Sequence, residues 1–403
     1  MKKFSLFLLI LLNAFASELQ DAIDNAQNGD IIELSNGVYK GGILINKAIT
    51  INGVDNKAII DANGVGSVIT ITSPNVIIKN LTIQNSGSSH ENLDAGINAI
   101  NANHIVIENN IIKDVLFGID LKQTQEAVVV KNTISSRPAA LGLRGDALRL
   151  WYSHSGVIKQ NRVTNARDIV LWYSSNNTIS KNYSTNCRYS LHFMYAGANL
   201  VEDNIFENNS VGIFFMFSKG STVRNNTVKN SIGAFGVGIG MKDTSDFKFY
   251  NNTLMYNARG FYLDQSPFQP DTTNLFDSNI VAYNTVGIQF HATQHKSIFT
   301  NNTFKGNMEV ANNDTLGSKL ELNQWSQNYF DDYEGMDRDK DGFGDIAYKN
   351  YVYADKLWQQ NKAVQFFYGS SVMGLLNFLA KLAPFSEPSL LLSDDMPRMR
   401  EIK

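Results

Sequence analysis

The sequence predicts an all-β protein in the form of a parallel β-solenoid, and three observations predict it. A dipeptide that ends in asparagine recurs with steps of 22, 29, 21, 22, 22, 26, 27 and 23 residues, and a step near 22 is typical of one solenoid turn. A short apolar strand follows most of these asparagines about nine residues later. The chain of 403 residues also exceeds the roughly 250–300 residues at which one globular core stops growing. The recurring residues are Asn110, Asn132, Asn161, Asn182, Asn204, Asn226, Asn252, Asn279 and Asn302.

Each rung carries an apolar triplet. Its first and third members should face the interior and its second the outside, because strand side chains alternate between faces. The asparagine fits a turn position with special backbone angles, and its amide can pair with the next rung. The triplets are Ile119–Leu121, Leu148–Leu150, Ile169–Leu171, Leu191–Phe193, Ile213–Phe215, Ile239–Met241, Phe261–Leu263 and Ile288–Phe290.

The ends of the repeat are expected to differ from its middle. Earlier strands are predicted near Ile31–Leu34, Ile43–Ile45, Ile49–Ile51, Val68–Ile71 and Val76–Ile83. Glu18–Ala26 has helical spacing and should cap the open end of the solenoid. We therefore expect a β-helix over residues 17–315, an acidic junction over 316–355, and a docking helix and tail over 356–403.

Residues 1–16 have the features of a cleavable signal peptide. Lys2 and Lys3 precede the apolar stretch Phe4–Leu12, and Ala14–Ala16 has the small-residue pattern of a cleavage site. We expect export with cleavage after Ala16, with an uncleaved membrane anchor as the alternative. Cys187 is the only cysteine, so no intramolecular disulfide can form. A net charge of −3 without a basic tract argues against nucleic-acid binding.

Two insertions leave the same corner of the predicted solenoid, at Ser135–Gly145 and Ser231–Val237. A third, Gln265–Asn274, leaves the opposite turn. Insertions in solenoids form loops that often border a binding face. The rungs between the first two insertions are therefore where a functional surface is expected.

The outward positions of these rungs contain soft metal donors. The repeat register makes Met194 and Met216 neighbours, and His192 lies on the strand of Met194. Thioether and imidazole groups together suit Cu(I). Trp172, Met241 and His291 are further candidates for this surface, and Cys187 is either a fourth soft donor or a packed small residue. The alternative is an apolar surface that a loop or a partner protein covers.

The carboxylates argue against an enzyme. Sugar-cleaving solenoids need clustered acids with Arg or Lys on one outer face. Asp120, Asp146, Asp168 and Asp264 are spread over different columns and rungs of the predicted register. We expect no catalytic residues, and keep a β-helix carbohydrate-active enzyme or glycan-binding module as the alternative.

Six consecutive rungs of the repeat form a specific pattern: Arg144–Ser153, Arg167–Ser174, Arg188–Tyr195, Val211–Ser218, Gly238–Asp243 and Gly260–Pro267. In this order they resemble the NosD family of periplasmic maturation proteins for nitrous oxide reductase. The resemblance implies a right-handed β-helix that works with an ABC transporter, made of an ATPase and a membrane subunit, to build the copper centres of the reductase. It also implies that copper arrives from a lipoprotein chaperone. The family's His-Phe-Met and Phe-Met segments match His192–Met194 and Phe215–Met216.

The acidic segment after the last rung resembles a calcium loop. Asp337, Asp339, Asp341 and Asp345 stand at positions 1, 3, 5 and 9, with the Phe343 carbonyl at position 7. Tyr348 replaces the usual Glu at position 12, so Asp331 or Asp332 would have to supply another oxygen. A structural Ca²⁺ is expected here, and a plain acidic turn is the alternative.

The C-terminal part is apolar and then charged. Ala363–Leu382 is a weak candidate for a membrane span, because it contains polar residues and two glycines, and a better candidate for a helix that docks on a membrane subunit or a bilayer surface. Asp394–Lys403 is expected to form a charged tail that either frays or inserts into a partner.

Overall fold

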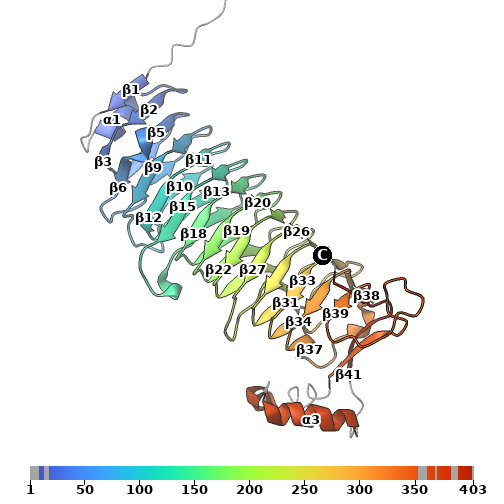
Figure 1. Cartoon of the computed structure of the whole chain (residues 1–403). Coiled ribbons are helices and arrows are strands. Elements are labelled where there is room, and N and C mark those ends of the chain that lie inside the picture. Colours follow the sequence, from blue (N-terminus) through green and yellow to red (C-terminus); the bar gives the residue numbers. More distant parts are fainter. Residues whose placement is uncertain (1–8, 13–17, 353–360, 368–369, 383–388, 402–403) are drawn as a thin grey trace, which may run out of the picture. The chain divides into compact units, whose positions relative to one another are not determined.

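The computed structural model describes residues 9–12, 18–352, 361–367, 370–382 and 389–401 (Figure 1). The chain forms two compact units, Met1–Ile205 and Phe206–Lys403. In each unit parallel strands add turn by turn to three sheets, here called A, B and C. The predicted fold class is confirmed: the protein is an all-β, right-handed parallel β-helix with few helices.

In the first unit every third strand belongs to the same sheet. Sheet A contains β1 (Leu9–Leu12), β2 (Ile31–Leu34), β5 (Thr50–Gly53), β8 (Ile77–Lys79), β11 (Val106–Glu108), β14 (Val128–Val130), β17 (Val157–Lys159), β20 (Thr178–Ser180) and β23 (Leu200–Glu202). Sheet B contains β3 (Gly37–Lys40), β6 (Ala58–Asp61), β9 (Leu81–Gln84), β12 (Ile111–Val115), β15 (Thr133–Ser136), β18 (Arg162–Thr164) and β21 (Tyr183–Thr185). Sheet C contains β4 (Ile43–Ile45), β7 (Ile69–Ile71), β10 (Ala95–Ile100), β13 (Phe117–Lys122), β16 (Leu148–Trp151), β19 (Asp168–Trp172) and β22 (Tyr189–Met194). The strand β24 (Ile205–Glu207) falls at the boundary of the units.

The second unit repeats this plan. Sheet A contains β26 (Thr222–Arg224), β29 (Lys248–Tyr250), β32 (Asn274–Asp277), β35 (Ser297–Thr300), β38 (Gln324–Ser326), β41 (Ser389–Asp394) and β40 (Tyr348–Val352). Sheet B contains β27 (Thr227–Lys229), β30 (Thr253–Met255), β33 (Ile280–Ala282), β36 (Thr303–Lys305) and β39 (Tyr329–Phe330). Sheet C contains β25 (Val211–Met216), β28 (Ile239–Lys242), β31 (Arg259–Asp264), β34 (Val286–His291) and β37 (Glu309–Asn313). The helical elements among the described residues are α1 (Glu18–Asn25), α3 (Ser371–Leu382) and the short 3-10 segments η1 (Val54–Asn56), η2 (Leu141–Leu143), η3 (Leu320–Leu322) and η4 (Lys362–Phe367).

The apolar triplets form sheet C, with their first and third members in the core as predicted, but second members such as Asp120 and Val170 are also covered, at 0% and 3% exposed. The first and third members, such as Ile119 and Leu121, are fully buried inside the coil. The core of the second unit is more aromatic, with Phe249, Phe276 and Phe299 stacked at 4.8 and 4.7 Å between ring centroids. Burial of such rings is a main source of stability, since each full side chain contributes about 1.5–3 kcal/mol.

The recurring asparagines form ladders of amide hydrogen bonds, as predicted. In the first unit Asn132 Nδ2 donates to Asn161 Oδ1 at 3.0 Å, and Asn161 Nδ2 to Asn182 Oδ1 at 3.0 Å. The special backbone angles fall one residue earlier than predicted, at Lys131 (φ 56°) and Gln160 (φ 56°). The first residue of each dipeptide therefore makes the turn, and the second supplies the buried amide.

The two ends of the described chain are closed differently. The predicted cap helix is α1, and Lys47 Nζ donates to carbonyls at its C-terminal end, including that of Ala26 at 2.9 Å. The strand β1, in the proposed leader, pairs with β2, while the predicted cleavage point lies outside the described residues. The segment predicted as one strand over Val76–Ile83 is two strands, because Asn80 adopts φ 60° between β8 and β9.

The β-helix continues past the boundary expected at residue 315. The strands β38 and β39 add in parallel to β35 and β36. The hairpin of β40 and β41 then adds to sheet A, and the asparagine ladder ends where Asn328 Nδ2 donates to the buried Asp394 at 2.8 Å. The prediction of a fraying or inserting tail is wrong for its described part, because Arg398 donates to Asn301 Oδ1 at 2.6 Å and to the Gln327 carbonyl.

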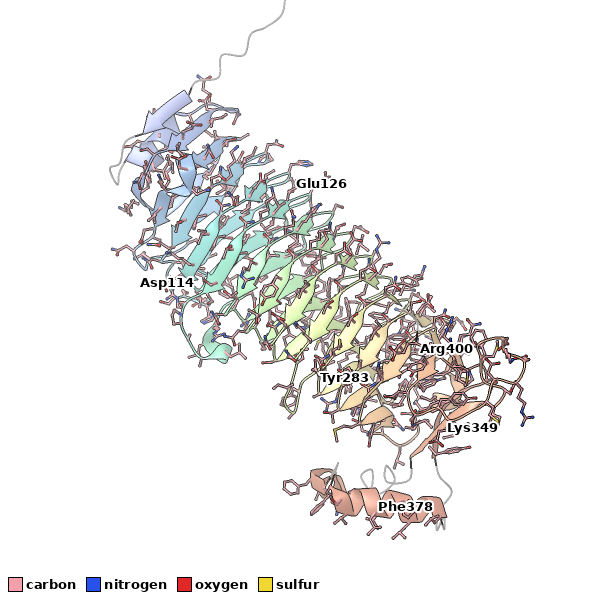
Figure 2. All side chains as sticks on the ribbon, in the orientation of Figure 1. Asp114, Glu126, Tyr283, Lys349, Phe378 and Arg400 are labelled. Carbon is pink, nitrogen blue, oxygen red and sulfur yellow. The ribbon has the colours of Figure 1, made fainter. Side chains whose placement is uncertain are left out.

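The apolar C-terminal segment forms η4 and α3. Among the described residues, none of the helices has the length and apolar character needed to cross a membrane. The side chains of α3 are nevertheless largely exposed, and Figure 2 shows Phe378 projecting from this helix.

Candidate functional site

The outer surface of sheet C in the first unit brings together three of the predicted residues. The strand register places Met194 beside Trp172 and His192 beside Val170. His192 and Met194 are two positions apart on β22, so both side chains leave the same face of the sheet. We call Trp172, His192 and Met194 the Met–His surface. Trp172 and Met194 are partly exposed, whereas His192 is 7% exposed, so this surface is less open than predicted.

His192 is an unusual buried histidine. Neither ring nitrogen has a hydrogen-bond partner among the described residues. The nearest charged atom is Asp168 Oδ2, 3.6 Å from Nδ1, which is within ion-pair range but too long for a hydrogen bond. The ring stacks on Tyr189 at 4.7 Å between centroids. A buried polar group without partners costs about 1–3 kcal/mol, so its retention calls for a functional reason.

Asp120, Asp146 and Asp168 of the first unit share one type of partner, which corrects the prediction that they are scattered. Each one accepts from an arginine of the following turn: Asp120 Oδ1 from Arg149 Nε at 2.8 Å, and Asp146 Oδ1 from Arg167 Nε at 2.8 Å. Arg188 bonds both oxygens of Asp168, with Nε at 2.9 Å from Oδ1. The carboxylates of these pairs are buried beside the Met–His surface, whereas the Arg188 side chain is 42% exposed. The prediction failed because Asp146 and Asp168 lie just before their triplets, and the predicted register covered only the triplets and the position after them.

The environment moves the pKa values of two of these carboxyl groups in opposite directions. Burial raises the pKa of Asp146 above its ordinary value of 3.8, and the hydrogen bond from Arg167 offsets only part of the effect. Burial also raises the pKa of Asp168, but the neighbouring His192 and Arg188 outweigh it and hold the pKa below 3.8. Asp168 is therefore the anion that faces His192.

Cys187 is a packed small residue and not a donor of the Met–His surface. It is 2% exposed, and its thiol donates to the Thr185 carbonyl at 3.4 Å. Burial raises the pKa of this thiol to about 11, so the thiolate that binds metals is disfavoured near neutral pH.

A stack of tyrosines borders the same surface and was missed by the sequence reading. Tyr152, Tyr173 and Tyr195 each follow a strand of sheet C with φ near 50°, and their rings stack at 4.8 and 5.1 Å between centroids. The signal in the sequence is the tyrosine that follows Trp151, Trp172 and Met194 in each rung. Trp151 and Trp172 also contact each other edge to face at 5.1 Å.

Two of the predicted residues lie on β25 and β28 of the second unit. Met216 is partly exposed and pairs in register with Lys242. Met241 is fully buried inside the coil, so its assignment to the outer surface is wrong: it is the third member of its triplet and faces inward. On the outside, the Phe214 ring covers Gly240, where an added Cβ would lie 2.3 Å from a ring carbon.

His291 also lies in the second unit, in a network of its own. Its Nδ1 is 2.7 Å from Asp314 Oδ1, and Gln289 Nε2 donates to Asp314 Oδ2 at 2.6 Å. Arg259 Nε in turn donates to Gln289 Oε1. This arrangement leaves Nε2 of His291 as the free ring nitrogen. On the two preceding strands of sheet C, Lys242 Nζ of β28 lies 3.2 Å from Asp264 Oδ2 of β31.

The acidic loop brings together part of the predicted calcium ligand set. Oxygen atoms of Asp337, Asp339 and Asp341 lie within 4.8 Å of one another. Gly342 takes φ 92°, which explains the glycine at position 6. Asp345 does not join the group, because its Oδ2 accepts from the Arg338 amide at 2.8 Å.

The other oxygen donors proposed for the loop have different partners. Asp332 accepts from the Tyr348 hydroxyl at 3.1 Å, and Asp331 accepts from the Gly306 amide at 2.6 Å. Tyr348, at position 12, is buried against Phe330. The Phe343 amide donates to Asp341 Oδ1 at 2.8 Å, which tightens the loop around the acidic group.

Comparison with known structures supports the fold alone. The A-module of the mannuronan C-5 epimerase AlgE6 from Azotobacter vinelandii has a TM-score of 0.57 at 17% identity, covering 77% of this chain and 93% of its own. The catalytic unit of a GH87 α-1,3-glucanase from Streptomyces thermodiastaticus has a TM-score of 0.63 at 15% identity, covering 77% of this chain and 65% of its own.

Comparison of sequences goes further. Residues 135–335 match the family described as "Periplasmic copper-binding protein (NosD)". A protein of Pseudomonas aeruginosa named "Probable ABC transporter binding protein NosD" is 31% identical over 94% of this chain and 90% of its own. Its namesake from Stutzerimonas stutzeri is 25% identical over 86% of this chain and 82% of its own. The chain belongs to the NosD family.

Proposed function

We propose that this protein works in the periplasm with an ABC transporter and handles copper for the copper centres of nitrous oxide reductase. The family description and the names of two relatives support the compartment, the metal and the transporter. The expected partners are the membrane subunit and ATPase of the transporter, a copper chaperone lipoprotein and the reductase. Copper is cargo in this proposal and is held transiently as Cu(I). Nucleic acid is not an expected partner, given the net charge of −3.

The observation that carries the copper proposal is His192. Its two ring nitrogens have no hydrogen-bond partner among the described residues, so one of them can bind a metal without first losing a bond. Met194 follows on the same face of β22, at a spacing of about 6.6–6.8 Å along the strand. An imidazole and a thioether favour Cu(I) over harder cations. Trp172 supplies apolar cover, and Met216 is the third donor proposed from the repeat register.

Anaerobic titration of the purified protein with Cu(I) against a chromophoric chelator tests this site. We expect His192→Gln and Met194→Leu each to weaken Cu(I) binding at least tenfold, and Met216→Leu to weaken it as well. Met241→Leu is the matched control, because this methionine is fully buried inside the coil. Equal affinities of the wild-type protein and the His192→Gln and Met194→Leu variants would rule out the assigned residues.

The helix α3 is the proposed contact with the transporter and the membrane surface. Val372, Leu375, Phe378 and Leu382 are 57–67% exposed, which is unusual for so many apolar side chains on one short helix. A photo-crosslinker at Leu379 should capture the membrane subunit when the transporter is co-expressed. The same probe at Val65, which is 74% exposed in the first unit, is the control. Equal yields from the two positions would contradict the docking role.

We expect no catalysis from the aspartates next to the Met–His surface. Asp120, Asp146 and Asp168 each accept hydrogen bonds from an arginine, which leaves none of them as an uncommitted general acid or base. A polyuronide panel assayed for cleavage or epimerisation tests the enzymatic alternative. Turnover that is lost in Asp168→Asn would support an enzyme in place of a carrier.

We also propose that Asp337, Asp339 and Asp341 hold a structural Ca²⁺, with the Phe343 carbonyl as the ligand expected from the loop pattern. The three carboxylates lie close together, and among the described residues no lysine or arginine side chain neutralises them. Calcium at a concentration 100 times the Kd of the site would add about 2.7 kcal/mol to the free energy of unfolding. Calcium should therefore raise the Tm by several degrees over EDTA, and Asp339→Asn should abolish the difference. If Ca²⁺ does not change the Tm of the wild-type protein, the segment is a plain acidic turn and not a calcium site.

A further inference from the structure

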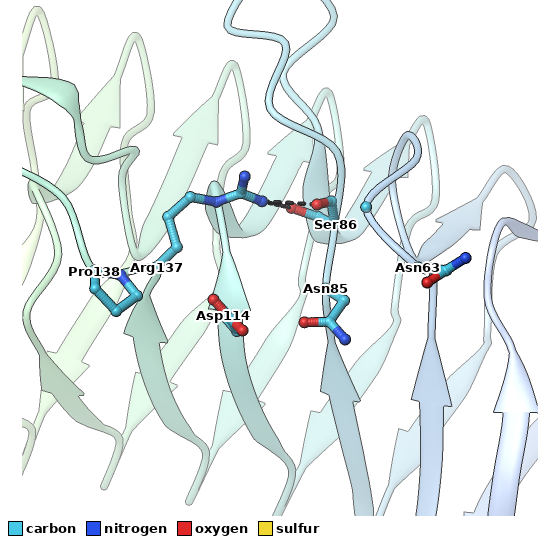
Figure 3. A pocket seen from close by; sticks show the side chains of 7 residues that line it. Asn63, Asn85, Ser86, Asp114, Arg137 and Pro138 are labelled. Carbon is cyan, nitrogen blue, oxygen red and sulfur yellow. Dashed lines mark hydrogen bonds between the residues drawn. The ribbon is translucent and has the colours of Figure 1, made fainter.

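The first unit contains a polar pocket of about 460 Å³ at the corner where strands of sheet B end. Asn63 follows β6, Asn85 follows β9, Asp114 lies in β12, and Arg137 follows β15. Figure 3 shows these residues along neighbouring turns of the coil. The pocket is lined by Asn63, Gly64, Asn85, Ser86, Asp114, Arg137 and Pro138.

Backbone geometry fixes the row of side chains on the floor of this pocket. Asn63, Asn85 and Asp114 all adopt left-handed backbone angles, with φ of 52°, 57° and 55°. Asp61 accepts from the Asn63 amide and from Asn85 Nδ2, each at 2.7 Å. The amide nitrogen of Asn85 is thereby committed, and its Oδ1 is left as an acceptor toward a ligand.

Arg137 supplies a fixed donor on the opposite side. Its Nη2 donates to the carbonyls of Ser86 and Gly87 at 2.7 and 2.8 Å, as Figure 3 shows for Ser86. Its Nε is buried and has no hydrogen-bond partner among the described residues. A guanidinium held by two carbonyls cannot turn to satisfy this N–H, so Nη1, which is not buried and has no hydrogen-bond partner among the described residues, is the donor that can reach a ligand.

Asp114 supplies a free acceptor. Its carboxylate is exposed and has no ion pair or hydrogen bond among the described residues, although Arg137 lines the same pocket. A simple anion would be repelled by the carboxylate of Asp114, and a simple cation would be repelled by the guanidinium of Arg137. A ligand suited to both is neutral and carries groups that donate and accept at once.

We propose that this pocket binds a neutral pyranose, either as a free sugar or as one unit of a polysaccharide. A hydroxyl group accepts from an Arg137 Nη1–H, and a neighbouring hydroxyl donates to Asp114. The Asn85 Oδ1 accepts from a third. A volume of about 460 Å³ lies in the usual range of small-molecule sites and holds one or two sugar rings. The site shares no residue with the Met–His surface, so it does not depend on copper handling.

Saturation-transfer NMR on the full chain tests the proposal. The neutral probes are glucose, galactose, maltose, cellobiose and cellotetraose, and the charged probes are galacturonic acid and glucosamine. We expect transfer to ring protons of at least one neutral probe. The signal should fall at least fivefold in Asp114→Gly and in Arg137→Gln. A stronger signal from cellotetraose than from glucose would assign the pocket to a polysaccharide, and the reverse to a free sugar.

The glycine variant keeps the left-handed turn at position 114. Asp55→Gly is its matched control, because Asp55 is also exposed, has φ 54° and lies outside the pocket. If no neutral probe shows transfer, or if the signal persists in both pocket variants, the proposal is overturned. Binding of the charged probes alone would overturn it too, in favour of an ion site. Unchanged Cu(I) affinity in Asp114→Gly would show that the two sites are separate.

Discussion

Two histidines on the outer surface of sheet C, one in each unit, have opposite environments. His192 is 7% exposed and neither of its ring nitrogens has a hydrogen-bond partner among the described residues. The side chain of His291 is 35% exposed, and its Nδ1 lies 2.7 Å from an Asp314 carboxylate that Gln289 also holds. The outer surface of sheet C thus carries one histidine that is buried without a hydrogen-bond partner among the described residues and one, in the neighbouring column, that is partly exposed and fixed.

The difference shows where each unit places its polar groups. In the first unit the three aspartates near His192 bond Arg149, Arg167 and Arg188, and the carboxylate of Asp168 stays 3.6 Å from the His192 ring. In the second unit no arginine bonds Asp314 among the described residues, and the carboxylate binds His291 instead. Competition for carboxylates therefore decides which histidine keeps both nitrogens free.

The largest effect should come from removing a buried carboxylate of the first unit. Asp120 is fully buried and pairs with Arg149, whose side chain is 11% exposed. Asp120→Ala leaves a buried guanidinium without its partner, which should cost about 3–5 kcal/mol of unfolding free energy. Asp264→Ala in the second unit removes the partner of Lys242, whose side chain is 42% exposed, and should cost about 1 kcal/mol or less. Urea unfolding of both variants measures the difference. Equal losses would mean that the pairs of the first unit are not specially buried.

Replacing the two histidines by phenylalanine should change stability in opposite directions. His192→Phe keeps a ring against Tyr189 and removes two buried nitrogens without partners, so it should stabilise the protein by about 1 kcal/mol. His291→Phe loses the bond to Asp314 and should destabilise by about 1–2 kcal/mol. Differential scanning calorimetry gives both values. A destabilised His192→Phe variant would mean that His192 has a structural partner.

The smallest effects should appear in the pH dependence of stability. The folded pKa of Asp168 lies below 3.8, so its contribution is present above that pH and is lost as the pH falls through the folded pKa. The folded pKa of Asp146 lies above 3.8, so its contribution has the opposite sign and is lost as the pH rises through the folded pKa. Asp168→Asn should flatten the loss of Tm below pH 4, and Asp146→Asn should flatten the loss above pH 4. Identical profiles of the two variants would contradict these assignments.

Much of the fold could be predicted because a solenoid repeats one local rule. The triplets, the asparagine ladder and the cap helix all follow from side-chain alternation and from the spacing of similar residues, which need only neighbouring turns. Prediction failed at the C-terminal end of the chain. There β41 adds to β38, and Asp394 replaces the next asparagine of the ladder through a contact 66 residues away in sequence. The repeat pattern of the sequence does not predict such a long-range contact.

The rung architecture, the outward position of His192 and Met194, and the acidic loop can be derived from the residues alone, because all of these depend on local spacing. The burial of His192, the bond of Asp146 to an arginine of the following turn, and the pocket shared by Asp114 and Arg137 emerge only when the turns are packed. These features depend on side-chain direction and on competition for hydrogen-bond partners between turns. Such competition is settled when the turns pack, so a repeat pattern can locate the functional surface but cannot say which of its groups remain free to bind.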